Sequence, residues 1–171
     1  MLFSRVLLFV LVVTGLKGES IGAANGLRAE LPVLTQLLHF IQWPEATAGG
    51  ERLIVGLAGY GEQPPAEWYR KAASRPVEFR AVQSAAQMRA CHVVLFGLLF
   101  SGRLESLLQA LSGHPVLTIA AIPGFARMGG MVELPALSEG HKLTVNLIAT
   151  RRSGFRIHPG LVSVAEFLRR E

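Results

Sequence analysis

The glycines at 56, 59 and 61 are the first residues of this chain whose type and spacing suggest chemistry. They follow a predicted strand and precede a predicted helix, which is where a loop can bind phosphate through its backbone N–H groups. Their spacing is GxxGxG rather than the GxGxxG of dinucleotide-binding loops, and no Lys-Ser/Thr pair follows. The motif therefore favours glycines that serve backbone packing over a phosphate site.

Histidine and cysteine give no metal-binding pattern. The five histidines never stand at metal-ligand spacing, and no second cysteine accompanies Cys91 in a zinc motif. Cys91 opens the apolar run CHVVLF, so we predict a buried, inert thiol rather than a reactive or intermolecular one. We expect no metal and no cofactor. The histidines are His39, His92, His114, His141 and His158.

A catalytic centre is not predicted either. The chain has no GxSxG motif and no Asp, since all twelve acidic residues are Glu, which excludes Asp-based triads and Asp-rich metal loops. Glu133 is the carboxylate for which we consider a pKa raised by burial, with a Glu that faces water as the alternative. The sequence therefore predicts a protein that is not an enzyme.

The stretch PVLTIAAIPGFARMGGMVEL, from Pro115 to Leu134, is the most distinctive of the chain. A run typical of a buried strand leads into a glycine-rich loop that is longer than a hairpin turn needs. Such loops at the ends of buried strands often carry recognition, although glycines and a plugging Phe can also serve geometry alone. We predict partner-binding residues here, at Gly124, Phe125, Arg127, Met128, Gly129 and Gly130.

The chain begins with the three-part layout of a secretory signal peptide. Arg5 precedes an apolar run from Val6 to Val13, and small residues follow at Gly22 and Ala24. We expect cleavage after Ala24, so that residues 1–24 are a signal peptide and 25–171 a single domain; a retained short anchor is the alternative. No later stretch is apolar for long enough to span a bilayer.

Apolar periodicity predicts the elements that must position the loop. Strands alternate with helices and end in an antiparallel pair, which indicates an α/β fold: one compact domain with a mostly parallel sheet, helices on both faces and a C-terminal antiparallel hairpin. The expected helices are 27–43, 62–74, 84–89, 102–111 (capped by Ser101), 146–152 and 159–169, and the expected strands are 53–57, 77–82, 91–96, 116–119, 131–134 and 142–147.

The net charge of +5 is modest, and the cations are scattered along the chain. This distribution suits a protein in an anionic envelope better than a dedicated nucleic-acid-binding protein, so we expect no nucleic-acid partner.

Several motifs together resemble the YfiR/HmsC-like periplasmic regulators. The likeness covers roughly residues 27–168, and its most specific part is the loop with the pattern GFAxxGGM. The other matching segments are Phe40-x-x-Trp43-Pro44, CHVVLF from Cys91 to Phe96, Leu143-x-Val145-Asn146-Leu147 and Arg151-Arg152-x-Gly154-Phe155-x-Ile157.

The resemblance implies regulation in the periplasm. It implies an inhibitory protein that binds the periplasmic sensory domain of an inner-membrane diguanylate cyclase or a related sensor, and that thereby lowers cyclic-di-GMP synthesis and biofilm formation. It also implies a homodimer, and release by an outer-membrane partner or by envelope or redox stress.

The chain departs from the family pattern at two places. Members often carry further cysteines that form disulfides, whereas here Cys91 is alone, so redox sensing through an internal disulfide is not implied. Ala120-Ala121-Ile122 also stands where members often have polar residues. A periplasmic domain that binds a small ligand remains the alternative function, because a cleft at the carboxyl ends of the strands suits either role.

Overall fold

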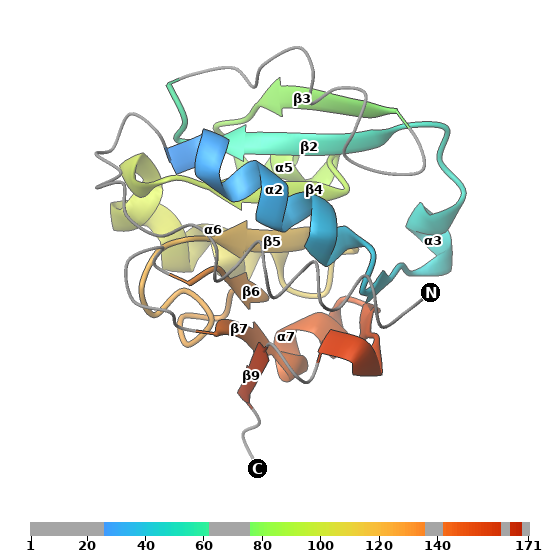
Figure 1. Ribbon diagram of the computed structural model, residues 1–171. Coiled ribbons are helices and arrows are strands. Elements are labelled where there is room, and N and C mark those ends of the chain that lie inside the picture. The colour runs from blue at the N-terminus through green and yellow to red at the C-terminus, as the bar shows by residue number, and fades with distance from the viewer. Residues whose placement is uncertain (1–25, 62–75, 136–141, 162–164, 169–171) are drawn as a thin grey trace.

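The computed structural model describes residues 26–61, 76–135, 142–161 and 165–168 (Figure 1). Within these ranges a seven-stranded sheet has the order β3-β2-β4-β5-β6-β7-β9. Neighbouring strands are parallel except for β6 and β7, which are antiparallel. The predicted α/β class, the mostly parallel sheet and the antiparallel pair near the C-terminus are therefore confirmed. The strands are β2 (Leu53–Ala58), β3 (Val77–Ala81), β4 (Val93–Phe96), β5 (Leu117–Ala120), β6 (Val132–Glu133), β7 (Leu143–Asn146) and β9 (Ala165–Leu168).

Helices cover both faces of the sheet, as expected. In Figure 1, α2 (Gly26–Leu38) lies across the front of the sheet, with α5 (Ala85–Arg89) and α6 (Leu104–Leu111) behind it. Apolar side chains accordingly form two clusters, one on each side. The remaining short helices are α3 (Glu45–Ala48), η1 (Leu98–Arg103), α7 (Leu147–Arg152) and η2 (Pro159–Leu161).

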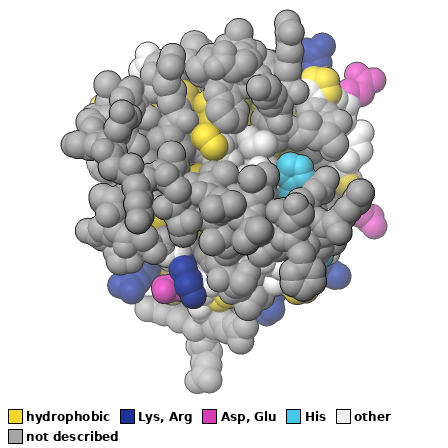
Figure 2. Space-filling model, viewed as in Figure 1, with side chains coloured by type: hydrophobic (Ala, Val, Ile, Leu, Met, Phe, Trp, Pro, Cys, Tyr) yellow, Lys and Arg dark blue, Asp and Glu magenta, His cyan; other side chains and the backbone are white. Residues whose placement is uncertain are grey.

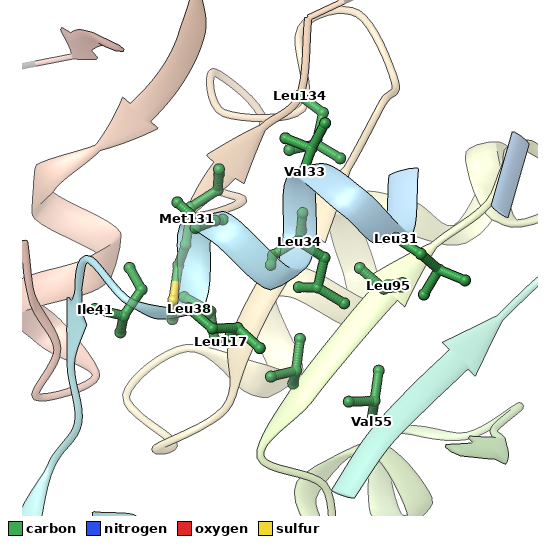
Figure 3. Packing of buried hydrophobic residues seen from close by; sticks show 14 of the residues in the cluster. Leu31, Val33, Leu34, Leu38, Ile41, Val55, Leu95, Leu117, Met131 and Leu134 are labelled. Carbon is green, nitrogen blue, oxygen red and sulfur yellow. The ribbon is translucent and has the colours of Figure 1, made fainter. Parts of the chain in front are cut away.

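The front cluster is built by the apolar stripe of α2. Leu31, Leu34 and Leu38 are buried and face the strand residues Leu95 and Leu117 (Figure 3). Their i, i+3, i+7 spacing places them on one side of the helix. Burying each such leucine stabilises the fold by roughly 1.5–3 kcal/mol, so the docking of α2 rests mainly on this stripe.

The first helix is shorter than the predicted range 27–43. It ends at Leu38, because the chain turns there into a two-residue strand, β1 (Ile41–Gln42), which pairs antiparallel with β8 (Arg156–Ile157). Pro32 lies well inside the helix and not in its first turn. Tertiary pairing and an edge contact of Trp43 with Phe155, with ring centroids 5.6 Å apart, overrode the helical pattern at this end.

Two further predictions were wrong. Ser101 does not cap a helix, because η1 continues through it and α6 begins only at Leu104. The expected last helix, 159–169, is instead η2 followed by β9, which pairs in parallel with β7. The backbone N–H and C=O groups on the free edge of β7 need hydrogen-bond partners. A parallel strand supplies these partners, whereas a helix does not. The predicted helix 62–74 falls outside the described residues.

The surface charge is mixed where it is described. Figure 2 shows the α2 side, on which described Lys and Arg side chains lie interspersed with Glu and do not form one block. Within the described ranges, no helix is both long and apolar enough to cross a membrane.

Candidate functional site

The loop after β5 is tied to the next strand by a carboxylate. Glu133, at the end of β6, accepts hydrogen bonds from the backbone N–H groups of Gly124 and Ala126, at 3.0 Å each and on different carboxylate oxygens. A carboxylate is an acceptor at both oxygens, so it can hold two adjacent N–H groups of a turn at once. Glu133 is half-buried, and its function in this structure is to fix the start of the loop.

Two more side chains hold the rest of the loop. Asn146 donates from Nδ2 to the Ala126 carbonyl at 2.8 Å, while its Oδ1 caps α7 by accepting from Ile148 and Ala149. Thr118 Oγ1 accepts from the Met131 N–H at 3.0 Å. The loop is therefore anchored from β5, β6 and β7, which gives it a defined shape from which to present side chains.

Inside the loop, Phe125 is a core residue. Its ring is fully buried and lies 5.8 Å from the ring of Phe96, between centroids. Gly124 and Gly129 have φ of +80° and +106°, a backbone region that favours glycine. The geometric interpretation of these three residues is thus confirmed, whereas a direct role in binding a partner stays a prediction.

Only part of the loop between Phe125 and Gly130 is exposed to solvent. Arg127 is exposed, but Met128 is only partly so, since it packs against the apolar cluster that includes Leu108 and Phe125. Its flexible thioether fills space beside the loop, which is a common use of methionine.

A pair of leucines at the same edge was missed by sequence reasoning. Leu98 and Leu99 follow β4 on η1 and are 60% and 81% exposed, by far the most exposed large apolar side chains described. Parallel strands end at the same edge, and β4 is the neighbour of β5, so these leucines share the edge with the loop. The available signal was a leucine pair directly after Gly97, outside the apolar periodicity of the following helix. We call Leu98, Leu99 and Arg127 the carboxyl-edge surface.

Two glycines allow the backbone segments that follow β2 and β4 to pack closely at that edge. A Cβ added to Gly59 would lie 2.7 Å from the Phe100 ring, and one added to Gly97 would lie 2.7 Å from the Gly59 carbonyl oxygen. Both positions therefore need glycine for packing between the ends of β2 and β4. This accounts for Gly59 in the GxxGxG pattern without a phosphate.

Between α6, the loop and α7 lies a cleft of about 220 Å³. Met128 and Gly129 belong to both the loop and the wall of this cleft. The cleft also reaches Thr118 and Asn146, two of the side chains that anchor the loop.

Helix α2 carries a carboxyl group whose pKa is raised by burial. Burial raises the pKa of Glu30 to about 7 from its ordinary 4.5, and the Tyr60 hydroxyl, which donates to this carboxylate, opposes the shift. The pair links α2 to the end of β2. Glu30 was not singled out from the sequence.

The remaining candidates do not assemble a metal or redox centre in the described ranges. No group of three or more His, Cys or Glu side chains that could hold a metal occurs there. Cys91 is buried and free, and burial raises the pKa of its thiol, so its thiolate form is suppressed. The inert-thiol prediction agrees with this environment.

The fold and its anchored loop define a single α/β domain that presents a surface at the carboxyl edge of its sheet. A model of the family described as YfiR/HmsC-like matches residues 28–166, and the chain belongs to this family. The predicted resemblance is confirmed. At the family level this makes the protein a periplasmic regulator of the cyclic-di-GMP system, in a family of regulatory rather than catalytic proteins.

Proposed function

We propose that this protein binds the periplasmic sensory domain of an inner-membrane diguanylate cyclase and inhibits it. Cyclic-di-GMP synthesis and biofilm formation then fall while the complex persists. The carboxyl-edge surface is the docking face in this proposal.

The observation that carries the proposal is the exposure of Leu98 and Leu99 beside a loop held by three side-chain anchors. Leucines exposed to this degree leave apolar area in water, and burying it against a partner would recover roughly 25 cal/mol per Å². Arg127 adds a cation that can donate several hydrogen bonds in a fixed geometry, which favours a partner with carboxylates at the rim of its site.

Export and assembly complete the proposal. Residues 1–24 act as a signal peptide that is removed after Ala24, and the mature protein works as a homodimer that an outer-membrane partner sequesters to release the cyclase. N-terminal sequencing of periplasmic protein tests the first part, and a mature protein that begins at Met1 would contradict it.

Photo-crosslinking in cells tests the docking face. A photoreactive amino acid at Leu99 should yield a crosslinked product that contains a membrane-bound diguanylate cyclase, identified by mass spectrometry. The same group at Glu51, an exposed residue just before β2 at the opposite edge of the sheet, is the matched control and should give no such product. Crosslinking to the cyclase from Glu51 but not from Leu99 would contradict the proposed face.

A further inference from the structure

The loop after β5 contains a methionine that is partly exposed. Apart from Met1, the chain has three methionines, and they differ in burial. Met88 and Met131 are buried, with 0% and 3% of their surface exposed, whereas Met128 is partly exposed and lines the open cleft between α6, the loop and α7. Met131 borders the same cleft but presents almost no surface to it. A solute dissolved in water therefore meets Met128 first.

Met128 also connects the exposed segment of the loop to the body of the domain. The segment from Arg127 to Gly129 lies between parts of the loop that side chains of β5, β6 and β7 hold in place. Arg127 and Gly129 are exposed, whereas the Met128 side chain packs against the apolar cluster that includes Leu108. The position of this segment therefore depends on the apolar contact of Met128.

Oxidation of the thioether would change that contact. A two-electron oxidant such as hydrogen peroxide transfers one oxygen atom to the sulfur: an S=O bond forms, the O–O bond breaks, and the peroxide leaves as water. The sulfur loses two electrons and the peroxide gains them. The sulfoxide is polar and accepts hydrogen bonds, so keeping it against Leu108 would cost desolvation free energy. The oxidised side chain should therefore turn towards water and release the segment.

The lone cysteine does not compete for the oxidant. The thiolate is the reactive form of cysteine, and Cys91 is buried in an environment that raises the pKa of its thiol. Within the part of the chain that the structure describes, Met128 is thus the sulfur that is most open to oxidation.

We propose that Met128 is an oxidation site, and that its conversion to the sulfoxide weakens binding of the cyclase to the carboxyl-edge surface. Met128 directly follows Arg127, so release of the segment moves the cation that this surface contributes. Selective oxidation and release of the segment stand on the geometry alone, whereas the effect on binding rests on the proposed function. The loop then has a site of chemical modification in addition to its docking role.

Peptide mapping by mass spectrometry after graded hydrogen peroxide treatment of the purified protein tests the site itself. We expect Met128 to gain one oxygen atom at least about tenfold faster than Met88 and Met131, because the latter two are buried. Amide hydrogen exchange at Arg127 and Gly129 should accelerate in the oxidised protein, whereas exchange in β5 should stay the same. Equal oxidation rates of the three methionines in folded protein would overturn the assignment, and so would unchanged exchange at Arg127 after complete oxidation of Met128.

The affinity for the periplasmic sensory domain of the cyclase, measured before and after peroxide treatment, tests the regulatory effect. Oxidation of the parent should weaken binding by at least about fivefold. Met128→Leu keeps an apolar side chain of similar volume that peroxide does not oxidise, so its affinity should be equal before and after treatment. Met88→Leu is the matched control and should stay as sensitive to peroxide as the parent. Met128→Gln should bind weakly without peroxide, because its amide is polar like the sulfoxide.

The outcomes separate this site from the docking face. An unchanged affinity of the fully oxidised parent would overturn the regulatory effect, and so would a loss of affinity on oxidation of Met128→Leu, since another group would then be responsible. If the untreated parent does not bind the cyclase, the proposed function and the regulatory effect are both wrong. Selective oxidation of Met128 and faster exchange at Arg127 are measured without the cyclase and would still stand.

Discussion

The ring of Phe125 lies directly against Gly130, so closely that a Cβ on Gly130 would stand 2.1 Å from Phe125 Cε1. The two residues are at opposite ends of the loop after β5, and the Gly130 N–H also donates to the Phe125 carbonyl at 3.0 Å. This contact closes the loop on itself and seats the ring in the core. The loop thus has a fixed inner side, which leaves Arg127 on its outer side.

Gly130→Ala should therefore destabilise the protein. The buried ring has no space to retreat, and overpacking of this kind typically lowers the free energy of unfolding by about 1–3 kcal/mol. Phe125→Leu in the same chain should recover part of the loss, because the smaller side chain makes room. Gly49→Ala is the control, since no atom lies within 4 Å of a Cβ at that position. Denaturant unfolding gives the free energy of unfolding of the parent, Gly130→Ala, the double variant and Gly49→Ala. An equal free energy of unfolding for Gly130→Ala and the parent would disprove the contact.

The anchoring by Glu133 gives a second prediction. Glu133→Ala leaves the N–H groups of Gly124 and Ala126 without their acceptor, at a cost of about 1–3 kcal/mol each where the groups stay out of water. Their amide hydrogen exchange should accelerate more than that of β5. Glu166→Ala, an exposed glutamate on the neighbouring region of the sheet, should change neither quantity. Unaltered exchange at Gly124 and Ala126 would show that the carboxylate does not hold the loop.

Glu30 should make stability depend on pH. Its pKa is about 7 in the folded protein and near 4.5 in the unfolded chain, so between these values the folded state binds the proton more tightly. The free energy of unfolding should then fall as the pH rises from about 4.5 to about 7, by up to roughly 3 kcal/mol at 1.36 kcal/mol per pH unit. Glu30→Gln, which still accepts from Tyr60, should remove that slope, whereas Glu45→Gln on the exposed helix α3 should keep it. If the free energy of unfolding of Glu30→Gln still falls over this pH range, other titratable groups cause the pH dependence and the prediction for Glu30 is wrong.

The lone cysteine should behave as a packing residue. Cys91→Ser buries a hydroxyl in place of a thiol, which should lower the free energy of unfolding on the order of 1–3 kcal/mol. The oligomer size of the parent protein in gel filtration should be the same with and without reductant. A larger species that reductant dissociates would contradict the assignment.

Sequence periodicity predicted most of the fold because the buried strands and α6 carry strong apolar patterns. It failed where tertiary pairing decided the outcome. Ile41 and Gln42 follow a helical pattern but pair with β8, and Ala165–Leu168 has apolar spacing that suits a helix as well as an edge strand. Neither choice can be made from a local window, because the partner strand is distant in sequence.

Part of the candidate site could be predicted from the sequence. The glycine-rich loop was identified from its residues, but its anchors Thr118 and Asn146 were not, since their distances depend on strand order. Leu98 and Leu99 were missed because their position after Gly97, outside the apolar periodicity of the following helix, does not by itself show that they are exposed.

The most direct test of the docking face is the affinity of the purified protein for the periplasmic sensory domain of the crosslinked cyclase. Leu99→Ser with Arg127→Glu should lower this affinity by at least about tenfold, since interface centres contribute 1–2 kcal/mol or more per residue. The melting temperature should hardly change, because both side chains are exposed, and Arg52→Glu at the opposite edge should leave the affinity unchanged. An unchanged affinity of the double variant, with an intact fold, would contradict the central claim that the carboxyl-edge surface binds the cyclase.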